Sequence, residues 1–182
     1  MSSKARSHCS LAQTSDLVSD NRSTTVYLDD LTVGQTFVSA EHQLDVEQVV
    51  AFARQFDPQP FHLDDAAAKQ TFFKGLVASG WHTAAITMKL LVSGGAPIAG
   101  GVIGAGVEIE WPRPTQPNDR LHAESEIIDI RPSRSKPDRG LVMLRTTTIN
   151  QNGDAVQVLT SRLVVPRDPL RRNDGAPDPN PA

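Results

Sequence analysis

Cysteine is almost absent from the sequence: Cys9 is the only one among 182 residues, so no intrachain disulfide can form. A chain without disulfides suits a reducing compartment, and we expect a cytoplasmic protein. The first 24 residues also lack the apolar segment of a secretory signal peptide. Their polar, serine-rich composition predicts a disordered leader over residues 1–24.

A large charge of one sign is also lacking. The formal net charge is -3, which gives no general attraction to nucleic acid or to anionic lipid. Basic residues gather only in Arg131–Arg139 and Arg167–Arg172, where proline and aspartate lie between them. We predict solvated loops in both segments, with a phosphate-bearing ligand or an acidic carrier protein as the alternative for Arg131–Arg139.

The sequence has no hydrophobic run that reads as a membrane helix. Leu90–Val107 carries no charge over 18 residues, but it contains six glycines and one proline, which makes a poor helix. We interpret it as a helix end, a loop and a buried strand. It also holds neither a G-x-G-x-x-G nor a G-x-x-x-x-G-K-[ST] motif, so nothing in it predicts a phosphate-cradling nucleotide loop.

Two short helices are predicted in the first half of the chain, after a strand pattern that runs to Leu44. Asp45 is a natural N-cap, and apolar residues then recur at helical spacing as far as Phe56. Asp57 and the proline after it end that helix. A second short helix is predicted at Asp64–Phe72.

A longer helix should follow. Ser79 is a candidate N-cap, Gly80 allows close approach of backbone, and Trp81–Val92 is apolar around most of its circumference. A helix of that kind is predicted to be buried on most sides. We expect Trp81 and Met88 to serve core or subunit packing, with the wall of an acyl-chain site as the alternative.

Strands fill the second half of the chain. Asn152 and Gly153 between two β-branched runs predict a hairpin, and strands that follow one another most simply form an antiparallel meander. One sheet wrapped around a single buried helix is the α+β hot-dog arrangement. We expect it over residues 25–167, followed by a disordered tail at 168–182. The four predicted strands are Gly101–Trp111, Leu121–Ile130, Leu141–Ile149 and Ala155–Val165.

The stretch "FDPQPFHLDD" carries the candidate chemistry. Pro58 and Pro60 stiffen the loop, which holds Asp57 and His62 five residues apart. By itself Asp57 is more often a helix-end residue, and a lone histidine such as His62 is more often a satisfied, partly buried side chain. A metal site is disfavoured because no second histidine or cysteine lies at ligand spacing.

The motif resembles the hydratase signature of the MaoC-like family of hot-dog proteins, which includes the (R)-specific enoyl-CoA hydratases. The likeness is carried by "FARQFDPQPFHLDDAAA" and "GLVASG", and extends to "LDDLTVGQTF", "IEWPRPTQPNDRL" and "TINQNGDAV". The sequence departs from the family at Phe56, where a small residue is usual, and at Gln59, where asparagine is usual. Both departures affect the curvature of the loop and the orientation of its groups.

The resemblance implies an activity and site roles. Asp57 and His62 correspond to the catalytic pair, Gly80 to the residue whose backbone N–H receives the thioester oxygen, and Gln59 and Ser79 to neighbours that contact the substrate. The implied reaction is reversible hydration of a trans-2-enoyl thioester to the (R)-3-hydroxyacyl thioester, without a metal or a cofactor. The sequence does not decide which of Asp57 and His62 is the base. A non-catalytic acyl-thioester-binding subunit and an acyl-CoA thioesterase are the alternatives.

Partners follow from the fold and the resemblance. An uncovered sheet edge predicts pairing into a homodimer or a higher homo-oligomer, and the family places acyl tunnels close to the subunit contact. The substrate carrier is coenzyme A or acyl carrier protein. We expect His82, which comes two residues after Gly80, to make a structural hydrogen bond in the core or at an interface, with a catalytic role as the alternative.

Overall fold

The computed structural model describes residues 25–171. The leader predicted at 1–24 and residues 172–182 of the predicted tail lie outside this range. The beginning of that tail is tied to the body of the protein, because Arg171 forms an ion pair with Asp30 across 2.9 Å. Arg167 likewise pairs with Asp29 at 2.5 Å. Within the described part of the chain, no helix is long and apolar enough to cross a membrane.

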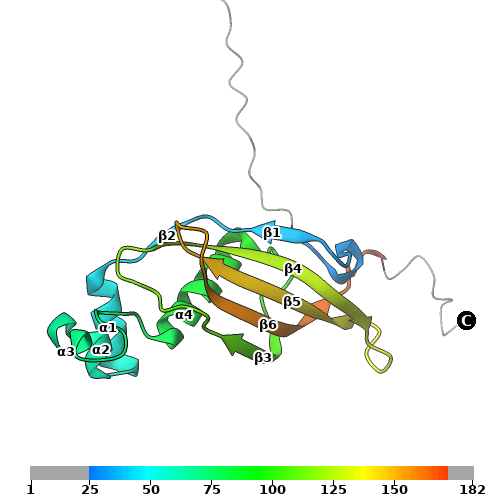
Figure 1. Ribbon diagram of the computed structural model, residues 1–182. Helices are drawn as coiled ribbons and strands as arrows, with labels where there is room; N and C mark the ends of the chain where they lie inside the picture. The colour runs from blue at the N-terminus through cyan, green and yellow to red at the C-terminus, as the bar shows by residue number, and fades with distance from the viewer. Residues whose placement is uncertain (1–24, 172–182) are drawn as a thin grey trace, which may run out of the picture.

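One antiparallel sheet dominates the architecture (Figure 1). Its strands pair in the order β1-β4-β5-β6-β3, and β2 pairs with β4 beside β1. The sheet therefore has β3 at one edge and β1 and β2 at the other. The strands are β1 (Thr36–Val38), β2 (His42–Gln43), β3 (Gly104–Glu110), β4 (Arg120–Pro132), β5 (Arg139–Ile149) and β6 (Ala155–Pro166).

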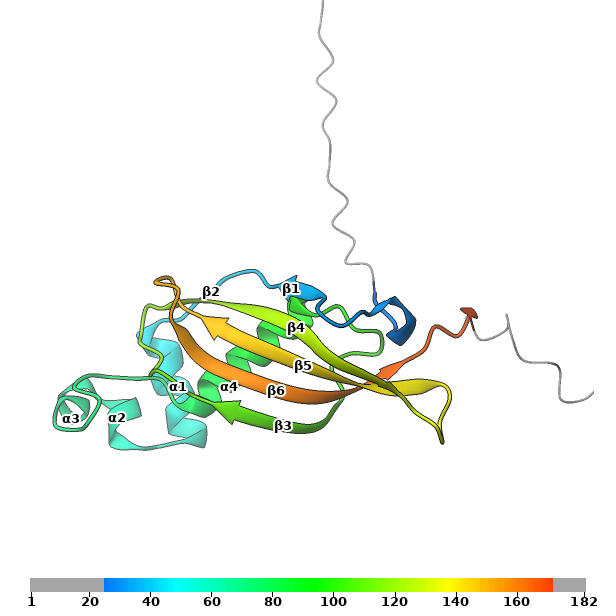
Figure 2. The ribbon, with the colours of Figure 1, turned by 45° about the vertical axis from the view of Figure 1, so that its right-hand side comes forward.

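The central helix α4 lies along one face of this sheet, as the turned view of Figure 2 shows. It continues into the π-helical segment η2, which brings the helical stretch to Gly95. A sheet wrapped over one long helix is the hot-dog fold, so the predicted fold class is confirmed. The helices are η1 (Leu28–Asp30), α1 (Val46–Phe56), α2 (Pro60–Leu63), α3 (Asp65–Lys69), α4 (Gly80–Leu90) and η2 (Leu91–Gly95).

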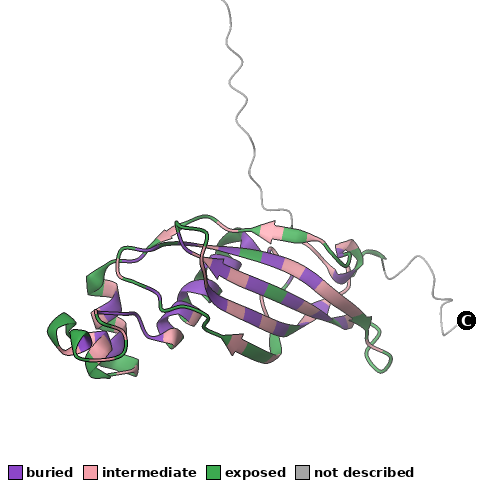
Figure 3. Ribbon diagram, in the orientation of Figure 1, coloured by how far each residue is buried: buried purple, intermediate pink, exposed green. Residues whose placement is uncertain are grey.

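Strict alternation along the strands builds the core. In β5, Val142, Leu144, Thr146 and Thr148 are buried while the residues between them are half-buried or exposed. Figure 3 shows the resulting stripes across the sheet. Because side chains alternate between the two faces of a strand, one face of the sheet packs on α4 and the other faces solvent.

Threonines, and not apolar residues alone, join α4 to the sheet. The buried Thr87 hydroxyl lies 2.6 Å from the Thr148 hydroxyl and accepts a hydrogen bond from Gln157 Nε2 at 2.9 Å. Gln157 Oε1 in turn accepts from the indole N–H of Trp111 at 3.0 Å. This network fixes Trp111, at the end of β3, relative to the central helix.

Two local predictions need correction. The strand predicted at Gly101–Trp111 pairs with β6 at the far edge and does not precede β4 in a meander, because β1 and β2 already occupy the free side of β4. The proline-rich stretch 112–117 resists a tight hairpin and carries the chain across instead. The helix predicted at Asp64–Phe72 is shorter, and α2 begins earlier at Pro60, whose fixed φ suits a first helical position.

The central helix is less enclosed than its composition predicts. Trp81 is 61% exposed and Met88 is 42% exposed, so the core role expected for these two side chains is wrong within a single chain. His82, Thr83, Ile86, Thr87 and Leu90 form the buried side of α4.

Candidate active site

Helix boundaries place the two candidate catalytic groups. Helix α1 ends at Phe56, and Asp57 closes it by donating its backbone N–H to the Ala53 carbonyl. The chain turns sharply, since the Gln59 N–H donates to the Asp57 carbonyl at 2.7 Å. Helix α2 then starts, and it carries His62 on its first turn. The sequence motif therefore folds back so that its acid and its imidazole face each other.

The Asp57 carboxylate is held by two donors. Its Oδ2 accepts from the Ser79 hydroxyl at 2.7 Å, and its Oδ1 accepts from Gln59 Nε2 at 2.8 Å. The hydrogen bond from Ser79 lowers the pKa of Asp57 most, helped by Gln59 and by the proximity of His62, while partial burial acts in the opposite direction. Asp57 is therefore ionised at neutral pH.

His62 presents one defined nitrogen to this carboxylate. The ring is buried, and its Nδ1 lies 2.8 Å from the Val77 carbonyl oxygen. A carbonyl only accepts, so Nδ1 must carry a proton, and in the neutral imidazole Nε2 is left with its lone pair. Nε2 lies 3.4 Å from Asp57 Oδ2. Two acceptors that face each other at this distance favour a donor such as water beside both.

Ser79 and Gly80 begin helix α4 next to the pair. Ser79 is fully buried, donates to Asp57, and caps the helix by accepting from the Trp81 N–H at 3.2 Å. No acceptor takes the Gly80 N–H within residues 25–171. It is one of the orphan donors of a helix start, where the helix dipole favours negative charge.

Gly80 is required by packing and not by an unusual backbone angle. A Cβ at this position would lie 2.8 Å from Trp111 Cε2 and 3.0 Å from two further ring atoms. The first turn of α4 thus rests directly on the indole ring. Since Gln157 holds that ring from the other side, the position of the Gly80 N–H is coupled to the sheet.

These groups border a cavity of about 460 Å³. Asp57, Gln59, His62 and Gly80 line it, whereas Ser79 lies behind the wall. Five of the nine Phe, Trp and Tyr residues of the chain also line it: Phe61, Phe72, Phe73, Trp81 and Trp111. The site therefore combines one ionised acid, one imidazole and one helix N-terminus with apolar walls.

The structure brings together four of the five predicted site residues at the cavity and places Ser79 behind Asp57. Direct contact of Ser79 with a substrate stays a prediction, because its hydroxyl is donated to Asp57. Trp111 was missed by sequence reasoning. Its only signal was its position in "IEWPRP", directly after a strand.

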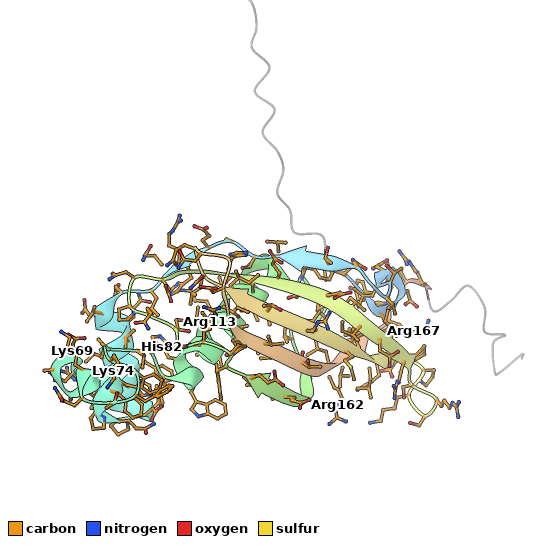
Figure 4. All side chains as sticks on the ribbon, viewed as in Figure 1. Lys69, Lys74, His82, Arg113, Arg162 and Arg167 are labelled. Carbon is orange, nitrogen blue, oxygen red and sulfur yellow. The ribbon has the colours of Figure 1, made fainter. Side chains whose placement is uncertain are left out.

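The basic segment Arg131–Arg139 lies far from the cavity. It forms the hairpin between β4 and β5, at the end of the molecule opposite α2 and α3 (Figures 1 and 2). Figure 4 shows Lys74 at the end that carries α2 and α3, and Arg113 between that end and the sheet. Arg113 is the one Lys or Arg among the residues that line the cavity, and it pairs with Asp154 at 3.3 Å.

His82 packs in the core, but the hydrogen bond expected for its ring is not made within residues 25–171. Its ring stacks on Phe52 with the centroids 4.5 Å apart, and its buried Nδ1 has no hydrogen-bond partner. Burial lowers the pKa of His82 to about 4, and the nearby His42 contributes to this shift. In the part of the chain that is described, no three His, Cys, Asp or Glu side chains are grouped as metal ligands.

Comparison with known proteins shows which family the chain belongs to. Residues 30–149 match the family described as MaoC like domain. The chain belongs to the MaoC-like dehydratase family. Its predicted resemblance is thereby confirmed.

Named relatives agree with this assignment. The crystal structure of the MaoC-like dehydratase from Rhodospirillum rubrum is 53% identical, with a TM-score of 0.78 over 79% of this chain and 99% of that one. R-Hydratase PhaJ1 from Pseudomonas aeruginosa is 26% identical, with a TM-score of 0.64 over 79% of this chain and 88% of that one. The uncharacterized protein YdeM of Bacillus subtilis (strain 168) is 34% identical over 127 residues, which are 68% of this chain and 87% of YdeM.

Proposed function

We propose that this MaoC-like protein is a hydro-lyase that adds water reversibly to a trans-2-enoyl thioester, giving the (R)-3-hydroxyacyl thioester. The observation that carries the proposal is the separation of 3.4 Å between Asp57 Oδ2 and His62 Nε2 at the wall of a cavity that Gly80 also lines. Family membership and the likeness to an R-hydratase support the same chemistry.

Asp57 and His62 act on the same water molecule in different roles. Asp57 already accepts two hydrogen bonds and its pKa is lowered, so it is a weak base and orients the water by accepting one of its hydrogens. His62 Nε2 takes the other proton while the water oxygen bonds to C3. The electrons of the double bond move onto the thioester oxygen and form an enolate.

The imidazolium of His62 then returns that proton to C2, and the enolate collapses to the thioester. One water is added in all, and His62 is neutral again. Dehydration runs through the same steps in reverse. The Gly80 N–H donates to the enolate oxygen, and such a donor contributes on the order of 3 kcal/mol, or about a hundredfold in rate.

The carrier and the quaternary structure form part of the proposal. The substrate is an acyl-CoA or an acyl carrier protein thioester, and Arg113 at the cavity is the cation that meets the phosphates of the carrier. Met88, Val92 and Val107 are exposed on α4, η2 and β3, and β3 is an uncovered edge strand. Covering this surface with a second copy of the chain gives a homodimer.

The test is turnover of crotonyl-CoA, followed by loss of the conjugated thioester absorbance beside a measurement of free thiol. We expect the absorbance to fall without thiol release, and the rate to drop at least roughly a hundredfold in Asp57→Asn and in His62→Gln. Asp129→Asn and His122→Gln, which change the same residue types on β4 away from the cavity, serve as matched controls. They should keep the wild-type rate.

Other outcomes point to the alternatives. Thiol release in step with the absorbance change would identify a thioesterase. Acyl-CoA binding without turnover, in a folded protein, would identify a non-catalytic binding subunit.

A further inference from the structure

The only two tryptophans of the chain contact each other at one end of the catalytic cavity. Trp81 lies in the first turn of α4 and Trp111 follows the last residue of β3. Their rings meet edge to face, with centroids 5.6 Å apart and an interplanar angle of 77°. The pair therefore bridges the start of the central helix and the end of the edge strand.

A second, strongly apolar cavity lies along the next two turns of α4. It measures about 400 Å³ and runs between α4, β3 and the inner face of β6. On the helix it is lined by Ala84 and Met88, which follow Trp81 by one and two turns, and on the strand by Ile109 and Val107. Neither tryptophan lines it, and neither Met88 nor Ile109 lines the catalytic cavity.

The two rings are held differently. Trp111 is fixed, because Gln157 accepts from its indole N–H and Gly80 packs against its six-membered ring. Trp81 is 61% exposed, and its side chain makes no hydrogen bond within the described residues. A substitution that removes the Trp81 ring therefore breaks the contact between the two tryptophans without taking a buried group out of the core.

We propose that the Trp81 and Trp111 pair closes the catalytic cavity against the apolar cavity, and that it restricts the substrate to short acyl groups. This inference rests on the proposed function and adds the residues that set its acyl-group size. The apolar cavity is what a longer chain would enter if the pair were removed. Each additional methylene buried there improves binding about fourfold.

The first test compares crotonyl-CoA with trans-2-octenoyl-CoA as substrates of the wild type and of Trp81→Ala. We expect the wild type to prefer the four-carbon substrate, and Trp81→Ala to raise the eight-carbon to four-carbon ratio of kcat/KM at least tenfold, mainly through KM. Leu141→Ala removes an exposed apolar side chain of β5 that lines neither cavity, and should leave that ratio within twofold. An unchanged ratio in Trp81→Ala, an equal shift in Leu141→Ala, or equal use of both substrates by the wild type would overturn the proposal.

A second test needs no catalysis. Calorimetric titration with the saturated butyryl-CoA and octanoyl-CoA should show that Trp81→Ala gains at least tenfold in relative affinity for the longer chain. Because Trp111 is the only tryptophan left in this variant, octanoyl-CoA should also change its fluorescence. If the wild type turns over neither enoyl-CoA, the proposed reaction fails and this titration still decides the inference: a gain for octanoyl-CoA upholds the boundary, and equal gains or no binding refute it.

Discussion

Replacing Gly80 by alanine tests whether the packing of one ring fixes the catalytic geometry. The new Cβ would lie 2.8 to 3.0 Å from three ring atoms of Trp111. Ordinary carbon contacts are about 3.5 to 4.0 Å, so either the ring or the first turn of α4 has to move by roughly 0.5 to 1 Å. Gln157 holds the ring by its N–H, which leaves the helix start as the part that shifts.

Two magnitudes follow from that displacement. Overpacking of a closely packed site costs about 1 to 3 kcal/mol of the free energy of unfolding. A shift of about 1 Å in a positioned group costs up to roughly a hundredfold in rate. We therefore expect Gly80→Ala to lower the free energy of unfolding moderately and to lower kcat more than it raises KM.

The assay is a double-mutant cycle with Trp111→Leu, read by urea unfolding and by hydration of crotonyl-CoA. Gly80→Ala should lower the free energy of unfolding less in the Trp111→Leu background than in the wild type, with a coupling energy of about 1 kcal/mol or more. If Gly80→Ala is as stable and as active as the wild type, the steric argument is wrong. If Gly80→Ala lowers the free energy of unfolding equally in the wild type and in Trp111→Leu, the new Cβ does not clash with Trp111.

Three further changes probe the surroundings of the site. Ser79→Ala removes the main hydrogen bond that lowers the pKa of Asp57, so that pKa rises, the carboxylate that orients the water is held by one donor fewer, and kcat falls roughly tenfold or more. His82 is 8% exposed and its pKa is lowered from 6.5 to about 4, so the folded state binds a proton less readily than the unfolded state. The free energy of unfolding therefore falls by up to about 3 kcal/mol as the pH drops from about 6.5 to 4. Urea unfolding at a series of pH values should show a smaller dependence of this free energy on pH in His82→Leu. Thr87→Val leaves the buried Gln157 amide donor without its acceptor and should lower the free energy of unfolding by about 1 to 3 kcal/mol in thermal or urea melts.

Each of these expectations has a contrary result. A wild-type kcat in Ser79→Ala would mean that the Ser79 hydroxyl does not position the Asp57 carboxylate for the reaction. A His82→Leu variant with the wild-type pH dependence of stability would mean that another group loses protons on folding. A Thr87→Val variant as stable as the wild type would show that the Gln157 amide finds another acceptor.

Local signals explain which elements could be predicted from the sequence. Asp45 accepts from the Gln48 N–H at 2.8 Å and starts α1, and Ser79 caps α4, as their side-chain chemistry indicates. The hairpin between β5 and β6 turns at Gly153, which has a φ of 80°. In each case a few adjacent residues determine the outcome.

Contacts between distant segments could not be predicted in the same way. The pairing of β3 with β6 depends on which sheet edges are already occupied, and periodicity carries no information about that. The pairing of Asp57 with His62 was expected from the resemblance of their motif to the family signature. The Ser79 hydrogen bond to Asp57 and the packing of Trp111 on Gly80 join segments separated in the chain, and no local pattern marks them.

A hydro-lyase adds water across the carbon–carbon double bond and leaves the thioester intact. Mass spectrometry of the products of crotonyl-CoA turnover, in water labelled with ¹⁸O and separately with deuterium, distinguishes this reaction from hydrolysis. We expect an intact 3-hydroxyacyl-CoA with one ¹⁸O at C3 and one deuterium at C2 from the forward addition, and none of either label above background in Asp57→Asn. Free coenzyme A together with ¹⁸O in a released carboxylate would contradict this expectation.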